Sequence, residues 1–138
     1  MKILIADDDR VYVRLVAARL AAKGIEVLTA YDAMQAWMAT VWLKPDTVIL
    51  DINMPAGTGR EFLKRLRMMA KTAHIRVVVV SGSISPEEQS EFTSSGADEF
   101  LPKPVDFDQL FEALHRLLGI PLPPEYPRSE TELPATSR

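Results

Sequence analysis

Polar side chains stand at the ends of four apolar runs in this sequence, where each run gives way to a turn. They are Asp7 and Asp8 after the first run, Asp51 after the second, Ser81 after the third and Lys103 after the fourth. If the runs are parallel strands, their carboxyl ends meet at one edge of one sheet, and these side chains gather there. A carboxylate nucleophile, a hydroxyl donor and a fixed cation in one place suit the chemistry of a phosphoryl group.

The aspartates also suggest a metal ion. The carboxylates of Asp7, Asp8 and Asp51 would repel one another, so a pocket that gathers them must raise a pKa or hold a cation. Oxygen ligands with no histidine or cysteine beside them favour Mg²⁺, which keeps several waters and takes only one or two protein carboxylates. The alternative is that the run from Asp7 to Asp9 only caps the first helix. The polar residues at the other strand ends favour the metal site, with Asp9 alone as the cap.

The apolar runs that would position these side chains predict five strands. Two of them are nearly unbroken aliphatic runs, which is typical of central strands covered on both faces and therefore of a mostly parallel sheet. The predicted strands are residues 2–6, 26–29, 47–50, 77–80 and 99–101.

Windows with the apolar spacing of helices follow the strands. Their apolar positions are Val11, Leu15, Ala18 and Ala22; Met34, Trp37, Met38 and Val41; Phe62, Leu63, Leu66 and Met69; and Leu110, Phe111, Leu114, Leu117 and Leu118. The window from 86 to 95 has Phe92 as its one large apolar residue, so we expect that helix to be the least stable. Trp42 is out of phase with its window and is expected to be exposed.

Several residues carry the signals of helix ends. Asp32 and Asp106 are predicted N-caps, because a short acceptor can take free amide protons, and Ser85 begins a capping box with proline at the first helical position. Gly24 and Gly96 stand where a left-handed closing residue is needed. Strand and helix thus alternate five times.

This alternation within 138 residues predicts one α/β domain: a doubly wound, five-stranded parallel sheet with five helices on its two faces. The net charge of −3 is dispersed, which gives no reason to expect nucleic acid as a direct partner. The absence of cysteine excludes disulfides and zinc–thiolate sites. Because no segment approaches the length of a membrane span, we expect a cytoplasmic protein without a membrane partner.

Four motifs, in this order, resemble the receiver domain of two-component response regulators. They are residues 3–9 (ILIADDD), 48–55 (VILDINMP), 79–82 (VVSG) and 96–104 (GADEFLPKP). The resemblance covers roughly residues 1 to 118, about the length of one domain. It implies the flavodoxin-like strand order 2-1-3-4-5 for the sheet.

The resemblance also implies a role for each site residue. Asp51 is the phosphoacceptor, which takes a phosphoryl group from a histidine kinase or a histidine phosphotransfer protein. Asp8 and Asp51 ligate Mg²⁺ directly, Asp7 acts mainly through water, and Asn53 offers its backbone carbonyl. Lys103 contacts the phosphoryl oxygens. The protein would then be a regulatory phosphoacceptor and not an enzyme, catalysing only its own phosphorylation and dephosphorylation.

The charge balance predicts a switch. Three carboxylates, one Mg²⁺ and one lysine sum to zero, and an acyl phosphate of about −2 on Asp51 leaves about one excess negative charge. Ser81 is placed to move in as a donor, and the resemblance implies that Phe100 then turns inward to fill the vacated space. A downstream protein would read the surface formed by the fourth helix, fifth strand and fifth helix. The alternative for Phe100 is a purely structural role.

The sequence departs from the family in places. Ser81 stands where threonine is common, and Phe100 stands where tyrosine is frequent. The segment Gly57-Thr58-Gly59 departs from the commoner Met-Asp-Gly, which leaves the start of the third helix open. The resemblance implies a cis peptide between Lys103 and Pro104, whereas sequence alone favours trans.

Residues 119–138 form a separate segment, a proline-rich tail or linker that is expected to be flexible. It holds five of the ten prolines, and it is too short for an output domain. Residues 121–124 could instead act as a polyproline ligand.

Two other functions stay open at this point. One is a receiver-like adaptor that docks without phosphorylation. The other is a haloacid-dehalogenase-type phosphatase, which also uses a strand-end aspartate; it needs a second aspartate two residues on, where this sequence has Asn53.

Overall fold

Five parallel strands form the central sheet of the computed structural model, which describes residues 1–55, 58–82 and 84–121. The strands are β1 (Lys2–Ala6), β2 (Glu26–Ala30), β3 (Thr47–Asp51), β4 (Arg76–Ser81) and β5 (Glu99–Pro102). Their order is β2-β1-β3-β4-β5, and each neighbouring pair is parallel. The predicted fold class and strand order are confirmed. The aliphatic runs of β1, β3 and β4 are buried because these three strands are central.

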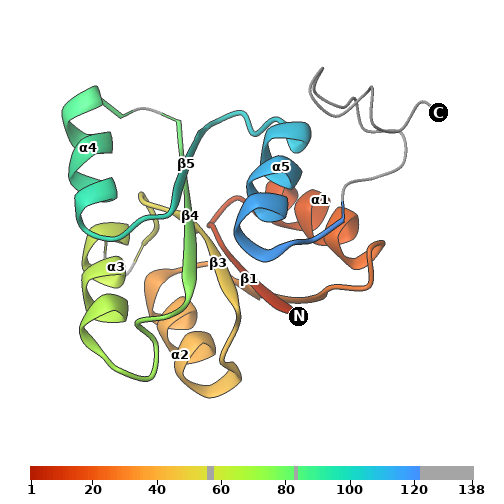
Figure 1. Ribbon diagram of the computed structural model, residues 1–138, viewed down its shortest axis with the longest axis horizontal. Coiled ribbons are helices and arrows are strands. Elements are labelled where there is room, and N and C mark those ends of the chain that lie inside the picture. Colours follow the sequence, from red (N-terminus) through yellow and green to blue (C-terminus); the bar gives the residue numbers. More distant parts are fainter. Residues whose placement is uncertain (56–57, 83, 122–138) are drawn as a thin grey trace.

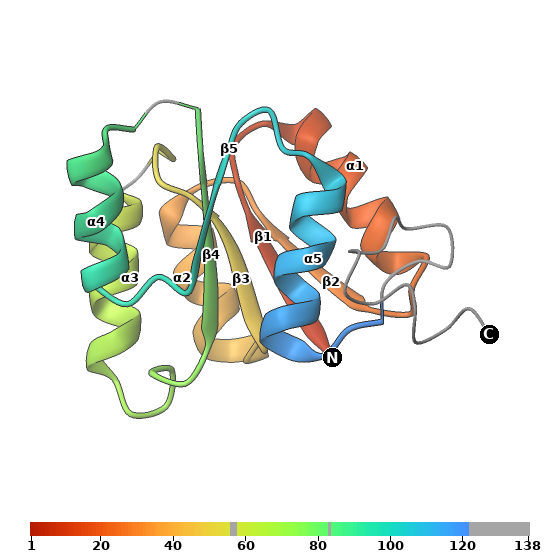
Figure 2. The ribbon, with the colours of Figure 1, turned by 45° about the horizontal axis from the view of Figure 1, so that its top comes forward.

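The helices form a layer on each face of the sheet (Figures 1 and 2). They are α1 (Arg10–Ala21), α2 (Ala33–Leu43), α3 (Gly59–Met68), α4 (Pro86–Ser94) and α5 (Phe107–Leu118). Helices α1 and α5 cover one face, and α2, α3 and α4 cover the other. Alternate strand residues therefore point into two separate apolar cores.

The predicted helix ends are confirmed where the structure describes them. Asp32, Asp106 and Ser85 cap their helices, and Ser85 forms the reciprocal capping box with Glu88. The start of α3, which the sequence left open, is also formed by a capping box. Thr58 is the N-cap and pairs with Glu61. Gly57 lies outside the described residues.

The predicted core face of α1 is wrong. Val11 and Leu15 are exposed, and the buried residues are Val13, Val16 and Leu20. The helix carries two apolar stripes, and the spacing of either one satisfies the same periodicity, so periodicity alone could not choose between them.

The predicted core face of α2 is wrong for its two methionines, although Trp37 is partly buried and packs against the core as predicted. Met34 and Met38 are exposed, whereas Ala33, Ala36 and Thr40 face the sheet. Small residues let the helix approach the sheet closely, and the Thr40 hydroxyl donates to the Ala36 carbonyl at 2.7 Å, which satisfies its buried polar group. Trp42 is exposed, as expected from its phase.

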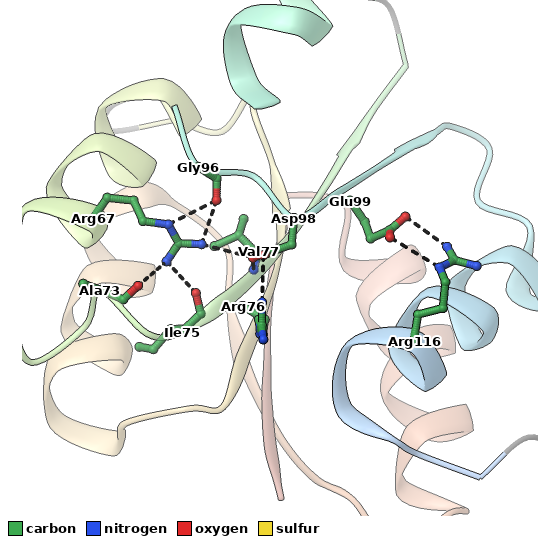
Figure 3. A network of polar contacts seen from close by, with 9 residues as sticks. All are labelled: Arg67, Ala73, Ile75, Arg76, Val77, Gly96, Asp98, Glu99 and Arg116. Carbon is green, nitrogen blue, oxygen red and sulfur yellow. Dashed lines mark hydrogen bonds and ion pairs between the residues drawn. The ribbon is translucent and has the colours of Figure 1, made fainter. Parts of the chain in front are cut away.

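Arg67 ties three chain segments together at the amino-terminal end of β4 and β5 (Figure 3). Its guanidinium donates to the carbonyl oxygens of Ala73, Ile75 and Gly96 at 2.6 to 3.1 Å. It also pairs with the Asp98 carboxylate at 3.1 Å. The end of α3, the turn before β4 and the turn before β5 are therefore fixed to one another.

The chain stays packed to Ile120, which is buried against the core under α1 and α5. Gly119 closes α5 in the left-handed conformation. The predicted tail lies almost wholly outside the described residues, which end at Pro121. Among the helices of the described part of the chain, none is long and apolar enough to cross a membrane.

Candidate phosphoryl and metal site

The carboxyl ends of the strands bring the predicted site residues together. Asp7 directly follows β1, Asp51 and Ser81 are the last residues of β3 and β4, and Lys103 directly follows β5. Asp7 and Asp51 are only 1% and 5% exposed, and Ser81 is buried, whereas Asp8 is exposed. One carboxylate oxygen from each of Asp7, Asp8 and Asp51 lies within 4.8 Å of the others. The parallel sheet thus produces an acidic cluster with one side open to solvent.

Short backbone turns orient the two buried carboxylates. Asp7 Oδ1 accepts the amide of Asp9 at 2.9 Å, and Asp51 Oδ1 accepts the amide of Asn53 at 3.1 Å. Each aspartate therefore holds one oxygen on the turn that follows its strand and directs the other toward the cluster. The Asp9 side chain instead accepts the amide of Tyr12 at 3.1 Å and caps α1.

Lys103 places its ammonium between the two buried carboxylates. Its Nζ lies 2.8 Å from Asp7 Oδ2 and 3.5 Å from Asp51 Oδ2. The Lys103 amide also donates to the Ser81 carbonyl at 2.8 Å, and its peptide bond to Pro104 is cis, as the resemblance implied. A Cβ built on Gly82 would lie 3.9 Å from Lys103 Cβ, so the chain after β4 runs beside this lysine.

The charges perturb one another. Burial raises the pKa of Asp7, and the nearby Asp51 charge raises it further, although contact with Lys103 and the Asp9 amide opposes both effects. For Lys103, burial lowers the pKa, but its contact with Asp7 and the charges of Asp51 and Asp7 outweigh burial and leave the pKa raised. Lys103 is therefore expected to carry its positive charge at neutral pH.

The donor set fits a hard divalent cation. Asp7 Oδ2 is buried and, among the described residues, accepts no well-aligned hydrogen bond; its close polar neighbour is the Lys103 ammonium. Three carboxylates and one lysine leave two negative charges, which Mg²⁺ would balance. The open side beside Asp8 leaves space for the waters that Mg²⁺ retains.

Tyr12 is part of this site and was missed from the sequence. The Lys103 ammonium lies 5.2 Å from the centre of its ring, which is within the range of a cation–π contact. Burial, followed by the charges of Asp7 and Asp51, raises the pKa of the phenol. Its hydroxyl is buried and has no hydrogen-bond partner within the described residues. Its position in the sequence could have identified it, because Tyr12 lies in the first turn of the helix that Asp9 caps, close to Asp7 and Asp8.

The two predicted switch residues, Ser81 and Phe100, lie on the neighbouring strands β4 and β5. Ser81 pairs in register with Pro102. Phe100 of β5 is partly buried and packs against the core under α4, to which Phe92 also belongs. The two histidines lie away from the cluster: His74 is exposed on the turn before β4, and His115 is exposed on α5.

A comparison with known families decides what kind of domain this is. Residues 3–115 match the family model of the response regulator receiver domain. The chain is a response regulator receiver domain. Receivers are the regulated modules of two-component signalling, in which response regulators partner with histidine kinases.

Relatives and solved structures agree with this assignment. The receiver is 32% identical over 117 residues to the DNA-binding dual master transcriptional regulator RpaA of Synechocystis, and 34% identical over 116 residues to the response regulator PleD of Caulobacter vibrioides. It aligns over 85% and 84% of its own length but spans only 48% and 26% of theirs. The chemotaxis protein CheY4 of Vibrio cholerae matches with a TM-score of 0.78 and 33% identity, over 85% of this chain and 98% of that one.

Proposed function

We propose that this receiver accepts a phosphoryl group on Asp51, with Mg²⁺ bound, and passes the signal to a protein partner by a conformational change. The observation that carries the proposal is the meeting of Asp7, Asp8 and Asp51 within 4.8 Å, with Lys103 Nζ 3.5 Å from Asp51 Oδ2. An ordinary helix cap explains Asp9 but neither the buried carboxylates nor the lysine between them.

The proposed reaction is a displacement at phosphorus. An oxygen of Asp51 forms a bond to phosphorus as the bond from phosphorus to the donor's histidine nitrogen breaks, and the imidazole leaves with that electron pair. Asp7 and Asp8 would hold Mg²⁺ together with Asp51, and the Asn53 backbone carbonyl would complete the protein ligands. When bound, the ion neutralises charge on the phosphoryl oxygens.

Lys103 is the second cationic group at the site, beside Mg²⁺. Its ammonium already bridges Asp7 and Asp51, so it needs only a small movement to reach an oxygen of the phosphoryl group. The Tyr12 ring beneath it limits where the ammonium can go. In this proposal the acceptor residues serve the receiver's own phosphorylation and dephosphorylation, and the domain acts as a regulator and not as an enzyme on other substrates.

The switch follows from the added charge. The acyl phosphate brings about one more negative charge than the carboxylate it replaces, and Ser81 at the end of β4 is placed to donate to it. Movement there would reach α4, which is held mainly by Phe92. It would also reach Phe100, which packs against the same core as Phe92. The partner would read the α4, β5 and α5 surface, where Arg116 of α5 pairs with Glu99 of β5 at 3.0 Å (Figure 3).

Phosphoryl uptake tests the proposal. With Mg²⁺ and acetyl phosphate, the intact mass of the wild-type protein should rise by one phosphoryl group, and that of Asp51→Asn should not change. Asp46→Asn is a matched control, because Asp46 is exposed and directly precedes β3, the strand that ends at Asp51. The Asp46→Asn protein should be labelled like the wild type. Equal labelling of Asp51→Asn would refute the acceptor. Folded wild-type protein that takes up none would support the adaptor that works without phosphorylation.

A further inference from the structure

An exposed apolar surface lies on α2 and α3, away from the switch surface of α4, β5 and α5. Among the described residues, nine large hydrophobic side chains are exposed, and six of them lie on α2 or at the end of α3. They are Met34, Met38, Trp42, Leu43, Met68 and Met69. Met68 is 74% exposed and Trp42 is 72% exposed. An apolar group of this size on one side of a domain is typical of a binding surface.

A groove runs between the two helices. It has a volume of about 700 Å³, and Met34 and Trp37 of α2 face Met68 and Met69 at the end of α3 across it. The Trp37 ring meets the Phe62 ring edge to face, with the ring centres 6.0 Å apart, so two packed aromatic rings form part of the groove lining. Its walls are methionines, whose flexible side chains adapt to different apolar partners.

The rim of the groove is basic. Lys64 and Arg65 line the groove, and Lys44 and Lys71 line a smaller hollow of about 110 Å³ that adjoins it at Met69. Within the described part of the chain, none of these four cations forms an ion pair, and Arg65 lies over the Trp37 ring with its guanidinium carbon 5.0 Å from the ring centre. The one acidic residue in the lining, Glu61, is already bonded to Thr58 in the capping box of α3. A negatively charged occupant would complete this rim.

We propose that the groove between α2 and α3 binds an acidic amphipathic helix of a partner protein. Apolar side chains on one face of that helix would enter between the methionines, and flanking carboxylates would meet the four cations. The groove would therefore be a second docking surface of the receiver, used in addition to the switch surface.

Two occupants from this chain fit less well. In a second copy, α4 is the acidic helix, but its large apolar residue, Phe92, is buried, so α4 has no apolar face to offer. The chain's own segment from 122 to 138 begins beyond Ile120, which packs on the α1 and α5 side of the sheet. That segment also contains four prolines, which oppose a helix with a continuous apolar face.

A synthetic helix provides the probe. It would have about five turns, or ~18 residues, with leucine and phenylalanine on one face and glutamate on both flanks. A second peptide would carry lysine in place of each glutamate, and a third would scramble the sequence so that the apolar face is lost. Titration into protein labelled with ¹³C at the methionine methyl groups should shift Met34, Met68 and Met69 with the acidic peptide. The other two peptides should bind at least about tenfold more weakly.

Paired variants locate the site. Charge reversal in Lys64→Glu with Arg65→Glu should weaken the acidic peptide about tenfold, as should Met34→Gln with Met68→Gln. The controls Arg14→Glu and Leu15→Gln change an exposed cation and an exposed apolar residue of α1, on the opposite face of the sheet, and should leave the affinity unchanged. Thermal unfolding of each variant checks that the fold is kept. None of these measurements requires phosphorylation, so they do not depend on Asp51.

Three results would overturn the inference. The first is equal binding of the acidic and basic peptides, or methyl shifts unaffected by the groove variants. The second is a concentration-dependent dimer, in sedimentation, that Met34→Gln with Met68→Gln dissolves, because a second copy would then occupy the groove. The third is a shift of the same methionines when residues 122–138 are removed, which would make the chain's own tail the occupant.

Discussion

Replacing Arg67 with methionine should strongly destabilise this receiver, although Arg67 lies far from the acidic cluster. Its guanidinium makes five hydrogen bonds, to three carbonyl oxygens and to the Asp98 carboxylate (Figure 3). Asp98 in turn accepts the Val77 amide at 2.8 Å, so the same cluster fixes the start of β4 to the start of β5. Methionine keeps an apolar stem of similar length and removes only these donors.

The magnitude follows from the burial of these groups. Each hydrogen bond contributes a net ~1 kcal/mol, and a bond to a charged partner contributes somewhat more. The Arg67 side chain is 22% exposed, so water can replace part of what is lost. Burial also lowers the pKa of Arg67, which means that its charge carries a desolvation cost in the wild type. Together these effects predict a loss of about 2–3 kcal/mol in the free energy of unfolding.

Urea unfolding, followed by circular dichroism, measures this loss. Arg60→Met is the matched control, because Arg60 lies on the same helix and pairs with Glu91 of α4 at 3.1 Å, but both side chains are at least half exposed. It should cost less than about 0.5 kcal/mol. If Arg67→Met and Arg60→Met cost the same small amount, the cluster in Figure 3 does not hold the strand ends together.

Three further changes test the site and the switch helix. Mg²⁺ titration, followed by NMR, should weaken sharply in Asp8→Ala and little in Asp9→Ala; the reverse order would mean that Asp9 is a ligand and not a cap. Because burial raises the pKa of Asp7, its protonated carboxyl group favours the fold below the ordinary value of 3.8, and this contribution is lost as the pH rises through the raised value and the group ionises. Asp7→Asn should therefore gain about 1 kcal/mol of stability near pH 7 and less as the pH falls, and urea midpoints that fall at neutral pH would contradict this. Phe92→Ala should cost about 3 kcal/mol and speed amide exchange in α4 above all; uniform exchange would deny that α4 is a separate, weakly held unit.

The strands and the acidic cluster could be predicted because they depend on local sequence and one topological rule. Unbroken aliphatic runs identify central strands, and parallel strands place all their carboxyl ends on one edge. Asp7, Asp51 and Lys103 therefore had to lie close together once the order of the sheet was known. The roles of Asp51 as acceptor and of Ser81 and Phe100 as switch remain predictions.

Other features depend on packing that periodicity does not reveal. In α1 and α2 two apolar stripes compete, and the structure buries the smaller residues of α2, including Thr40, and leaves its methionines exposed. The cation–π contact of Tyr12 joins the first helix to the residue after the fifth strand, which no local pattern predicts. Arg67 is another such case, because its carbonyl partners belong to two turns that meet only in the folded chain.

The most direct test of the phosphorylation switch uses beryllofluoride, which stands in for the phosphoryl group on Asp51. In backbone amide NMR with Mg²⁺, the wild-type protein should show its largest shifts at the acidic cluster and from Ser81 through Lys103, and nearly none beyond Gly119. Asp51→Asn should show only the shifts caused by Mg²⁺. If the wild type responds no more than Asp51→Asn, Asp51 does not take up the phosphoryl analogue. If the largest shifts away from the cluster lie beyond Pro121, the signal leaves through the tail and not through α4 and β5.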